Sequence, residues 1–129
     1  MRTELVNYIK GLKLKNLNVS DELPFSNSGI PLYMKNPKRI YIDLESIASE
    51  PLIVTFTNTI DTEVHTVKLY FTTDAKQLLS DYSSVISSIR AGKDVATDLN
   101  YFKRDVSNSV SYENDMIVTE VEFRFTKLT

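Results

Sequence analysis

The chain after Pro51 contains no further proline and only one glycine, Gly92. Proline cannot donate a hydrogen bond to a sheet and glycine weakens a strand, so their scarcity allows long uninterrupted strands. Apolar and polar residues also alternate along several segments of this region, with the period of two that a sheet with one buried face requires. The sequence therefore predicts antiparallel strands joined by hairpins.

This alternation sets the expected strand positions. A hairpin turn is expected at 58–63, where Asn58 and Asp61 are turn-forming residues, and another turn at 113–115. The stretch 99–112 is expected to form one long strand or a hairpin. The residues that mark one side of each strand are Ile40, Ile42 and Leu44; Leu52, Val54 and Phe56; Val67, Leu69 and Phe71; Phe102, Val106, Val110 and Tyr112; and Ile117, Val121, Phe123 and Phe125.

Two apolar stripes at helical spacing predict helices. The stripe that begins at Leu5 predicts a helix over 2–13, and the stripe that ends at Ile89 predicts a helix over 75–91. The resulting order, α-βββ-α-ββ, is typical of an α+β fold, with a mostly antiparallel sheet and the two helices packed on one face. Residues 1–129 are expected to form a single domain, because a chain of this length can bury a core of its own.

Between the first helix and the expected sheet of 38–129 lies a segment, 16–37, with neither period. Three prolines and Gly29 interrupt it, which predicts a long N-terminal arm or loop. Its apolar content is too high for a simple linker, so the arm is expected to pack either on another molecule or on its own core. The apolar residues that could anchor it are Phe25, Ile30, Leu32 and Tyr33.

The bulk composition excludes several functions. A net charge of −2 argues against a protein that depends on non-specific phosphate binding. The absence of cysteine excludes thiolate metal sites and cysteine nucleophiles, and no phosphate-binding glycine motif occurs, so no cofactor is expected. The N-terminal segment carries an acid at Glu4, and no stretch approaches the roughly 18 apolar residues of a membrane span. We therefore expect a protein made in the cytoplasm and not bound to a membrane.

The motif Asp74-Ala75-Lys76 has two interpretations. In the first, Asp43 and Asp74 hold a divalent cation and Lys76 activates the attacking water, as in a metal-dependent nuclease, with Glu4 as a further carboxylate. In the second, Asp74 caps the second helix, Gln77 completes a capping box, and Lys76 points to solvent. The second interpretation also explains where the apolar stripe of the helix starts. It is therefore preferred, and an enzyme is not expected.

The only histidine, His65, lies in phase with the apolar side of its strand. Glu63 is its one near neighbour on that side, which is too few ligands for a zinc site. No serine triad is credible either. A packed or edge histidine is expected.

Two groups of charged residues remain. The first lies where the arm enters the sheet, and it could contact nucleic acid or an acidic partner, or be a solvated strand start. The second forms the polar face of the last strand, which is usually the wet side of a sheet. In a ring with that face inward, it would line a lumen and keep DNA from binding there. The groups are Lys35, Lys38 and Arg39, and Glu120, Glu122 and Arg124, respectively.

Taken as a whole, the chain resembles the tail terminator (tail completion) proteins of long-tailed bacteriophages. The resemblance lies in the opening helix MRTELVNYIKGL, the arm, the strands, the helix DAKQLLSDYSSVISSIR and the closing strand MIVTEVEFRFTKLT. It implies a structural virion protein at the head-proximal end of the tail, assembled in the host cytoplasm as a ring homo-oligomer, expected to be a hexamer. Such a ring caps the tail tube and forms the surface on which the head docks.

The partners implied are further copies of the chain, the tail tube protein and the head–tail connector or neck protein, with DNA only as transiting cargo. The arm residues Phe25, Ile30, Leu32 and Tyr33 would anchor the subunit contacts. A neck or head–tail adaptor subunit, or another tail component such as a tail-tube protein, has a similar layout and stays an alternative, as does the metal-dependent nuclease.

Overall fold

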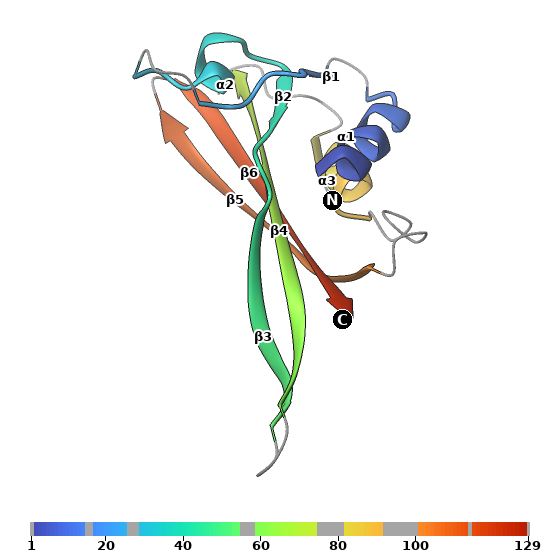
Figure 1. Ribbon diagram of the computed structural model, residues 1–129. Helices are drawn as coiled ribbons and strands as arrows, with labels where there is room; N and C mark the ends of the chain where they lie inside the picture. Colours follow the sequence, from blue (N-terminus) through green and yellow to red (C-terminus); the bar gives the residue numbers. More distant parts are fainter. Residues whose placement is uncertain are drawn as a thin grey trace.

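The computed structural model describes residues 2–14, 17–25, 29–54, 59–74, 82–91, 101–113 and 115–128. It has a mixed α/β fold built on a six-stranded sheet, which is compatible with the expected α+β class (Figure 1). The elements are α1 (Arg2–Gly11), β1 (Asn18–Val19), α2 (Leu32–Lys35), β2 (Arg39–Ile42), β3 (Ser46–Val54), β4 (Thr59–Asp74), α3 (Tyr82–Ala91), β5 (Tyr101–Glu113) and β6 (Met116–Leu128).

The long strand β4 lies at the centre of the sheet. The strand order is β1-β2-β4-β6-β5, and β3 also pairs with β4. β6 pairs with β4 from Thr62 to Asp74, while β2 and then β3 follow each other along the other edge of β4. All of these pairs are antiparallel, and only the short pair of β1 with β2 is parallel. The β3–β4 hairpin continues past the end of β6 and projects from the body (Figure 1).

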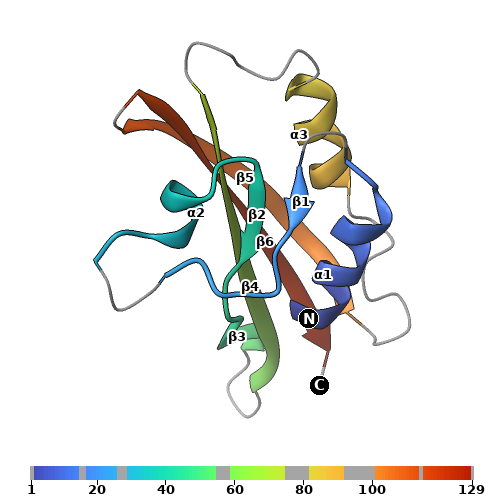
Figure 2. The same ribbon diagram turned by 90° about the horizontal axis from the view of Figure 1, so that it is seen from above.

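The main core lies between the sheet and two helices. Helices α1 and α3 cover the same face of the sheet, as the sequence predicted (Figure 2). The phenol of Tyr8 joins the two helices by donating to the carbonyl of Ser88 at 2.8 Å. Alternate residues of β2, β4 and β6 supply the sheet side, which is the period of two expected from the sequence. The buried residues are Leu5, Ile9, Leu17, Ile40, Ile42, Val67, Leu69, Phe71, Val85, Ile86, Ile89, Val121, Phe123 and Phe125.

A second, smaller core covers the opposite face at one end of the sheet. It contains Tyr33, Tyr41, Tyr70 and Val118, whose strand members alternate with those of the main core. The short helix α2 lies over this face, on the other side of the sheet from α1 and α3 (Figure 2). The sheet is therefore buried on both faces at this end, because the segment before β2 folds back over it.

The expectations for the first half of the chain had mixed outcomes. Of the two alternatives for the segment 16–37, its described part follows the second, since it contains β1 and α2 and packs on the sheet of its own chain. β2 ends at Ile42, so Leu44 is not a strand residue facing the core, and 65% of its surface is exposed. The order of elements accordingly contains a short strand and a short helix that α-βββ-α-ββ lacks.

The first hairpin turn was also misplaced. The expected turn at 58–63 overlaps β4, which begins at Thr59, and Val54 pairs directly with Thr59. Thr59, Ile60 and Thr62 are β-branched residues that favour a strand, and β3 supplies a pairing partner for each of them. By contrast, the second hairpin falls where expected, with β5 and β6 meeting near Asp115. Of the helix expected at 75–91, residues 75–81 lie outside the described part.

Candidate functional site

The sheet ends in an open edge at β5. In the described part of the chain, β5 pairs with β6 on one side and with no strand on the other. Residues 107–113 of β5 are all exposed. Natural edge strands are usually protected against pairing with other chains by lysine, proline, bulges or short length. Residues 106–113, with the sequence VSNSVSYE, contain neither lysine, arginine nor proline, and the ladder there is regular.

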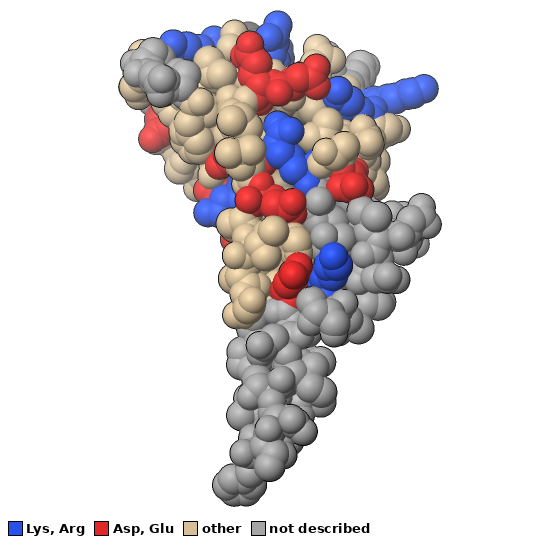
Figure 3. Space-filling view, in the orientation of Figure 1, with Lys and Arg blue, Asp and Glu red and all other residues tan. Residues whose placement is uncertain are grey.

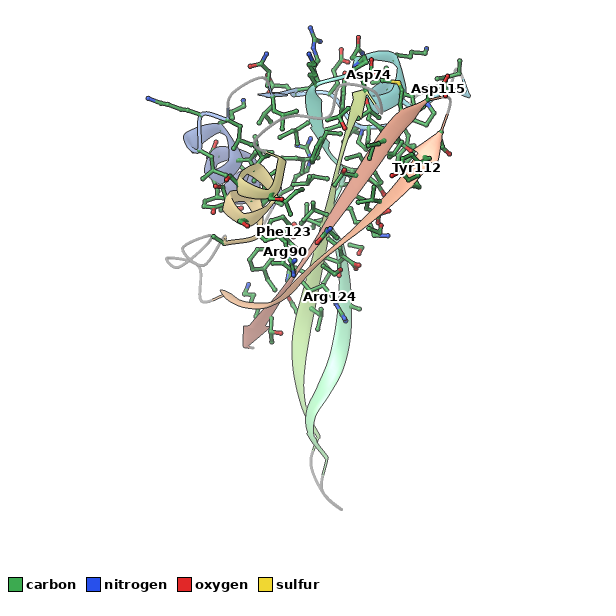
Figure 4. The ribbon with its side chains drawn as sticks, turned by 180° about the vertical axis from the view of Figure 1, so that it is seen from behind. Asp74, Arg90, Tyr112, Asp115, Phe123 and Arg124 are labelled. Carbon is green, nitrogen blue, oxygen red and sulfur yellow. The ribbon has the colours of Figure 1, made fainter. Side chains whose placement is uncertain are left out.

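Helix α3 contacts this edge at Val106. The Arg90 guanidinium donates through Nη2 to the carbonyl of Val106 at 3.0 Å. A cavity of about 480 Å³ lies along this contact. It is lined by Ile86, Ser87, Arg90, Ala91 and Val106. Figure 4 places Arg90 and Phe123 near the middle of the β5–β6 hairpin, and Tyr112 and Asp115 at its turn. The exposed residues 107–113 follow directly after this contact.

The opposite edge of the sheet is partly protected. β1 is only two residues long, and it contacts α1. In β3, Pro51 lies on the edge strand and the register shifts between Pro51 and Ile53. Both are features that discourage further strand pairing. Residues 46–49 precede them, pair regularly with β4 and are exposed.

The three charged residues predicted on the last strand do share one face. Glu120, Glu122 and Arg124 alternate with the buried residues of β6 and face away from α1 and α3. The Lys68 ammonium of β4 lies 3.3 Å from Glu120 Oε1. A shallow hollow of about 170 Å³ lies between these acids and the neighbouring residues Ser107, Asn108 and Ser109 of β5. Acidic and basic side chains are interspersed over the surface seen in Figure 3.

The predicted arm anchors have different environments. Tyr33 is buried in the smaller core of its own chain, so it is not available as an anchor for another subunit. Leu32 is partly buried against the same core. Phe25 and Ile30 remain 50% and 54% exposed. The basic group near this segment is also exposed, and its members are Lys35, Lys38 and Arg39.

Aromatic contacts hold this segment on the sheet. Tyr33 stacks on Tyr70, with ring centroids 5.0 Å apart, and Phe25 meets both rings edge-on. The Thr72 hydroxyl donates to the Tyr33 carbonyl at 2.6 Å. Burial, together with the nearby carboxylate of Glu120, raises the pKa of Tyr70 to about 12. The phenol of Tyr70 is thus neutral at all ordinary pH values.

The two aspartates of the nuclease interpretation, Asp43 and Asp74, are not brought together. The Asp43 amide donates to the carbonyl of Lys68, whereas Asp74 lies at the far end of the same strand. The six positions from Lys68 to Asp74 correspond to about 20 Å of strand. That distance is far too long for both carboxylates to bind one ion. Lys76 and the capping residue Gln77 lie outside the described residues.

His65 is buried, as expected for a packed histidine, and only 3% of its surface is exposed. Its Nδ1 lies 2.9 Å from Glu45 Oε2 and its Nε2 lies 3.0 Å from Glu63 Oε2. Sequence reasoning found Glu63 but missed Glu45, which lies in the link between β2 and β3. Within the described ranges, no group of three or more histidines and acids is placed to hold a metal ion.

Comparison with known proteins identifies no family for this chain. No protein-family model matches this chain. No curated protein sequence matches it either. Among the described residues, no helix has the length and apolar content needed to cross a membrane.

Proposed function

We propose that this protein is a structural subunit that assembles into a ring, and that the ring acts as a tail terminator of a long-tailed bacteriophage. The observation that carries the proposal is the open edge of β5, which is long, regular and exposed over 107–113. An edge of this kind is a template for adding a strand from another chain.

The two faces of the sheet differ, so a ring of identically oriented subunits would present one of them to its lumen. One face carries α1 and α3, and the other carries Glu120, Glu122, Arg124 and Lys68. Head-to-tail contacts between identical subunits close into a ring when the rotation between neighbours fits. If the charged face points inward, its two carboxylates balance Arg124 and Lys68, so the lumen wall has no net positive charge that would hold the DNA passing through it.

In this role the ring caps the tail tube and forms the surface on which the head docks. Its partners are further copies of the chain, the tail tube protein and the head–tail connector. It is located at the head-proximal end of the tail in the virion and acts without turnover. The half-exposed Phe25 and Ile30, with the exposed basic residues beside them, are a candidate surface for one of the other two partners.

The proposal is tested by the molar mass of the purified protein across a concentration series, measured by light scattering, with negative-stain images of the same samples. We expect closed rings of about six subunits. The variant Val110→Lys places a charge on the open edge and should shift the molar mass toward the monomer. Leu23→Lys, which also charges an exposed apolar residue but lies on no sheet edge, is the matched control and should assemble normally.

A strict monomer at every concentration would contradict the proposal. So would equal loss of assembly in both variants, because the edge would then have no special role.

A further inference from the structure

The exposed apolar residues of the two sheet edges lie on the same face of the sheet. On β3, Ile47 is opposite His65, in the row of β4 whose other members face α1 and α3. On β5, Val110 and Tyr112 lie in the row of Val106, which packs against the core under those helices. Ile47, Val110 and Tyr112 are 59%, 48% and 76% exposed. If the two edges met, these side chains would come together on one side of the new strand pair.

The strand directions also match. β3 is antiparallel to β4, β4 to β6, and β6 to β5. It follows that β3 and β5 of one chain run in opposite directions. In a ring whose subunits all have the same orientation, β5 of one copy therefore meets β3 of the next copy as an antiparallel pair. Such a pair forms the ordinary antiparallel hydrogen-bond ladder.

Along the strand direction, Ile47 on one edge and Val110 on the other are offset by an amount that fits a closed sheet. Ile47 is level with His65 of β4, while Val110 is level with Phe71, through Thr119 of β6. Strands in closed sheets tilt by about 35–45° from the axis, which over four strands at about 4.8 Å spacing gives a stagger of about four to six residues. The difference from His65 to Phe71 is six positions. An even number keeps the side chains on the same face.

We infer that neighbouring copies join by pairing residues 107–113 of β5 with residues 46–49 of β3 in the next copy, with Ile47 packed against Val110 and Tyr112. The inference rests on the proposed ring and specifies its subunit contact. The occupant of the open edge is thus a second copy of this chain, selected by strand direction and by the matching apolar face. The junction continues one sheet around the ring, with the helices on one side and the charged face on the other.

The chain has no cysteine, so introduced cysteines can test this junction without background. Two single variants, Ile47→Cys and Val110→Cys, are purified separately, mixed at a concentration where the protein assembles, and treated with a short bismaleimide. Directly opposed and diagonal residues of an antiparallel pair both lie within reach of such a reagent. Val110→Cys is also replaced by Tyr112→Cys to cover a shift in register by two residues.

We expect a covalent dimer from the mixture of β3 and β5 variants and its loss when Leu23→Cys replaces Ile47→Cys. A dimer from Val110→Cys alone would mean that two β5 edges pair with each other, and would overturn the inference. Assembly without any cross-link would overturn the junction but leave the proposed ring standing. A protein that stays monomeric at every concentration would overturn both.

Discussion

The packing of Tyr33 gives a prediction whose size follows from the structure. The side chain is 9% exposed and stacks on Tyr70 at 5.0 Å. Phe25 meets the same ring edge-on at 5.8 Å, and the Tyr33 carbonyl accepts a hydrogen bond from Thr72. The variant Tyr33→Ala removes the ring and both aromatic contacts but keeps the backbone hydrogen bond. It tests whether the segment before β2 is held on its own sheet.

Truncation of a buried aromatic residue to alanine costs about 3–5 kcal/mol of unfolding free energy. Phe25 is half-exposed and can move partly into the space, so we expect the lower end, about 3 kcal/mol. This is a large share of the roughly 5–15 kcal/mol that stabilises a typical domain. At about 3–4 °C per kcal/mol for a chain of this size, the melting temperature should fall by roughly 10 °C.

The assay is urea denaturation followed by far-ultraviolet circular dichroism. Ile30→Ala is the control, because Ile30 belongs to the same segment but is 54% exposed, and it should cost less than about 1 kcal/mol. If the two variants lose the same stability within about 0.5 kcal/mol, the segment is not packed on the sheet as described. Faster proteolysis of Tyr33→Ala within 17–35 would be a second expected sign.

Three further predictions concern other contacts. In an absorbance titration, Tyr70 should ionise only near pH 12, and the variant Tyr70→Phe should remove this late-ionising tyrosine. Because the pKa of Tyr70 is raised in the folded state, the stability that its neutral phenol contributes is present below pH 10. That stability is lost as the pH rises toward 12. His65→Ala should lower the free energy of unfolding by about 2–4 kcal/mol in urea denaturation, since it leaves a buried space and removes two contacts to carboxylates. Arg90→Ala should cost less than about 1.5 kcal/mol in the same assay, because the side chain is exposed and loses one hydrogen bond to Val106. A cost above 3 kcal/mol for Arg90→Ala, or a cost near zero for His65→Ala, would contradict these contacts.

The regular parts of the fold were predictable because each has a strong local pattern. The stripe around Leu5 specifies the first helix, and the alternation around Phe123 specifies β6. The turn near Asp115 joins the two strands with no proline or glycine nearby. In these elements the apolar side found from the sequence is the side that faces the core in the structure.

The remaining features depend on contacts between distant residues. Tyr41 lies between core residues on β2, and its burial comes from the segment that folds over it, including the amide of Asn36, which donates to its hydroxyl. Glu45 reaches His65 from twenty positions away, across a break between two strands. Turn-forming Asn58 and Asp61 suggested a turn, but pairing with β3 extends the strand β4 through Asp61 to Thr59.

The open edge at β5 could not be recognised from the periodicity of the sequence. Residues 106–113 alternate in the usual way, and nothing in that pattern distinguishes an edge strand from a central one. The available signal was the absence of lysine, arginine and proline from residues 106–113, since such residues usually protect an edge strand. Its meaning became clear only with the strand order, which places β5 last in the sheet.

The most direct test of subunit contact through β5 is amide hydrogen exchange over 107–113, compared at a concentration where the protein is monomeric and at one where it assembles. In an edge strand the outward amides have no partner strand, so they should exchange fast in the monomer and become protected when a second copy pairs with them. We predict protection over 107–113 and over 46–49 on assembly, with no change in the central strand β4. Assembly with unchanged exchange in β5 would contradict the account.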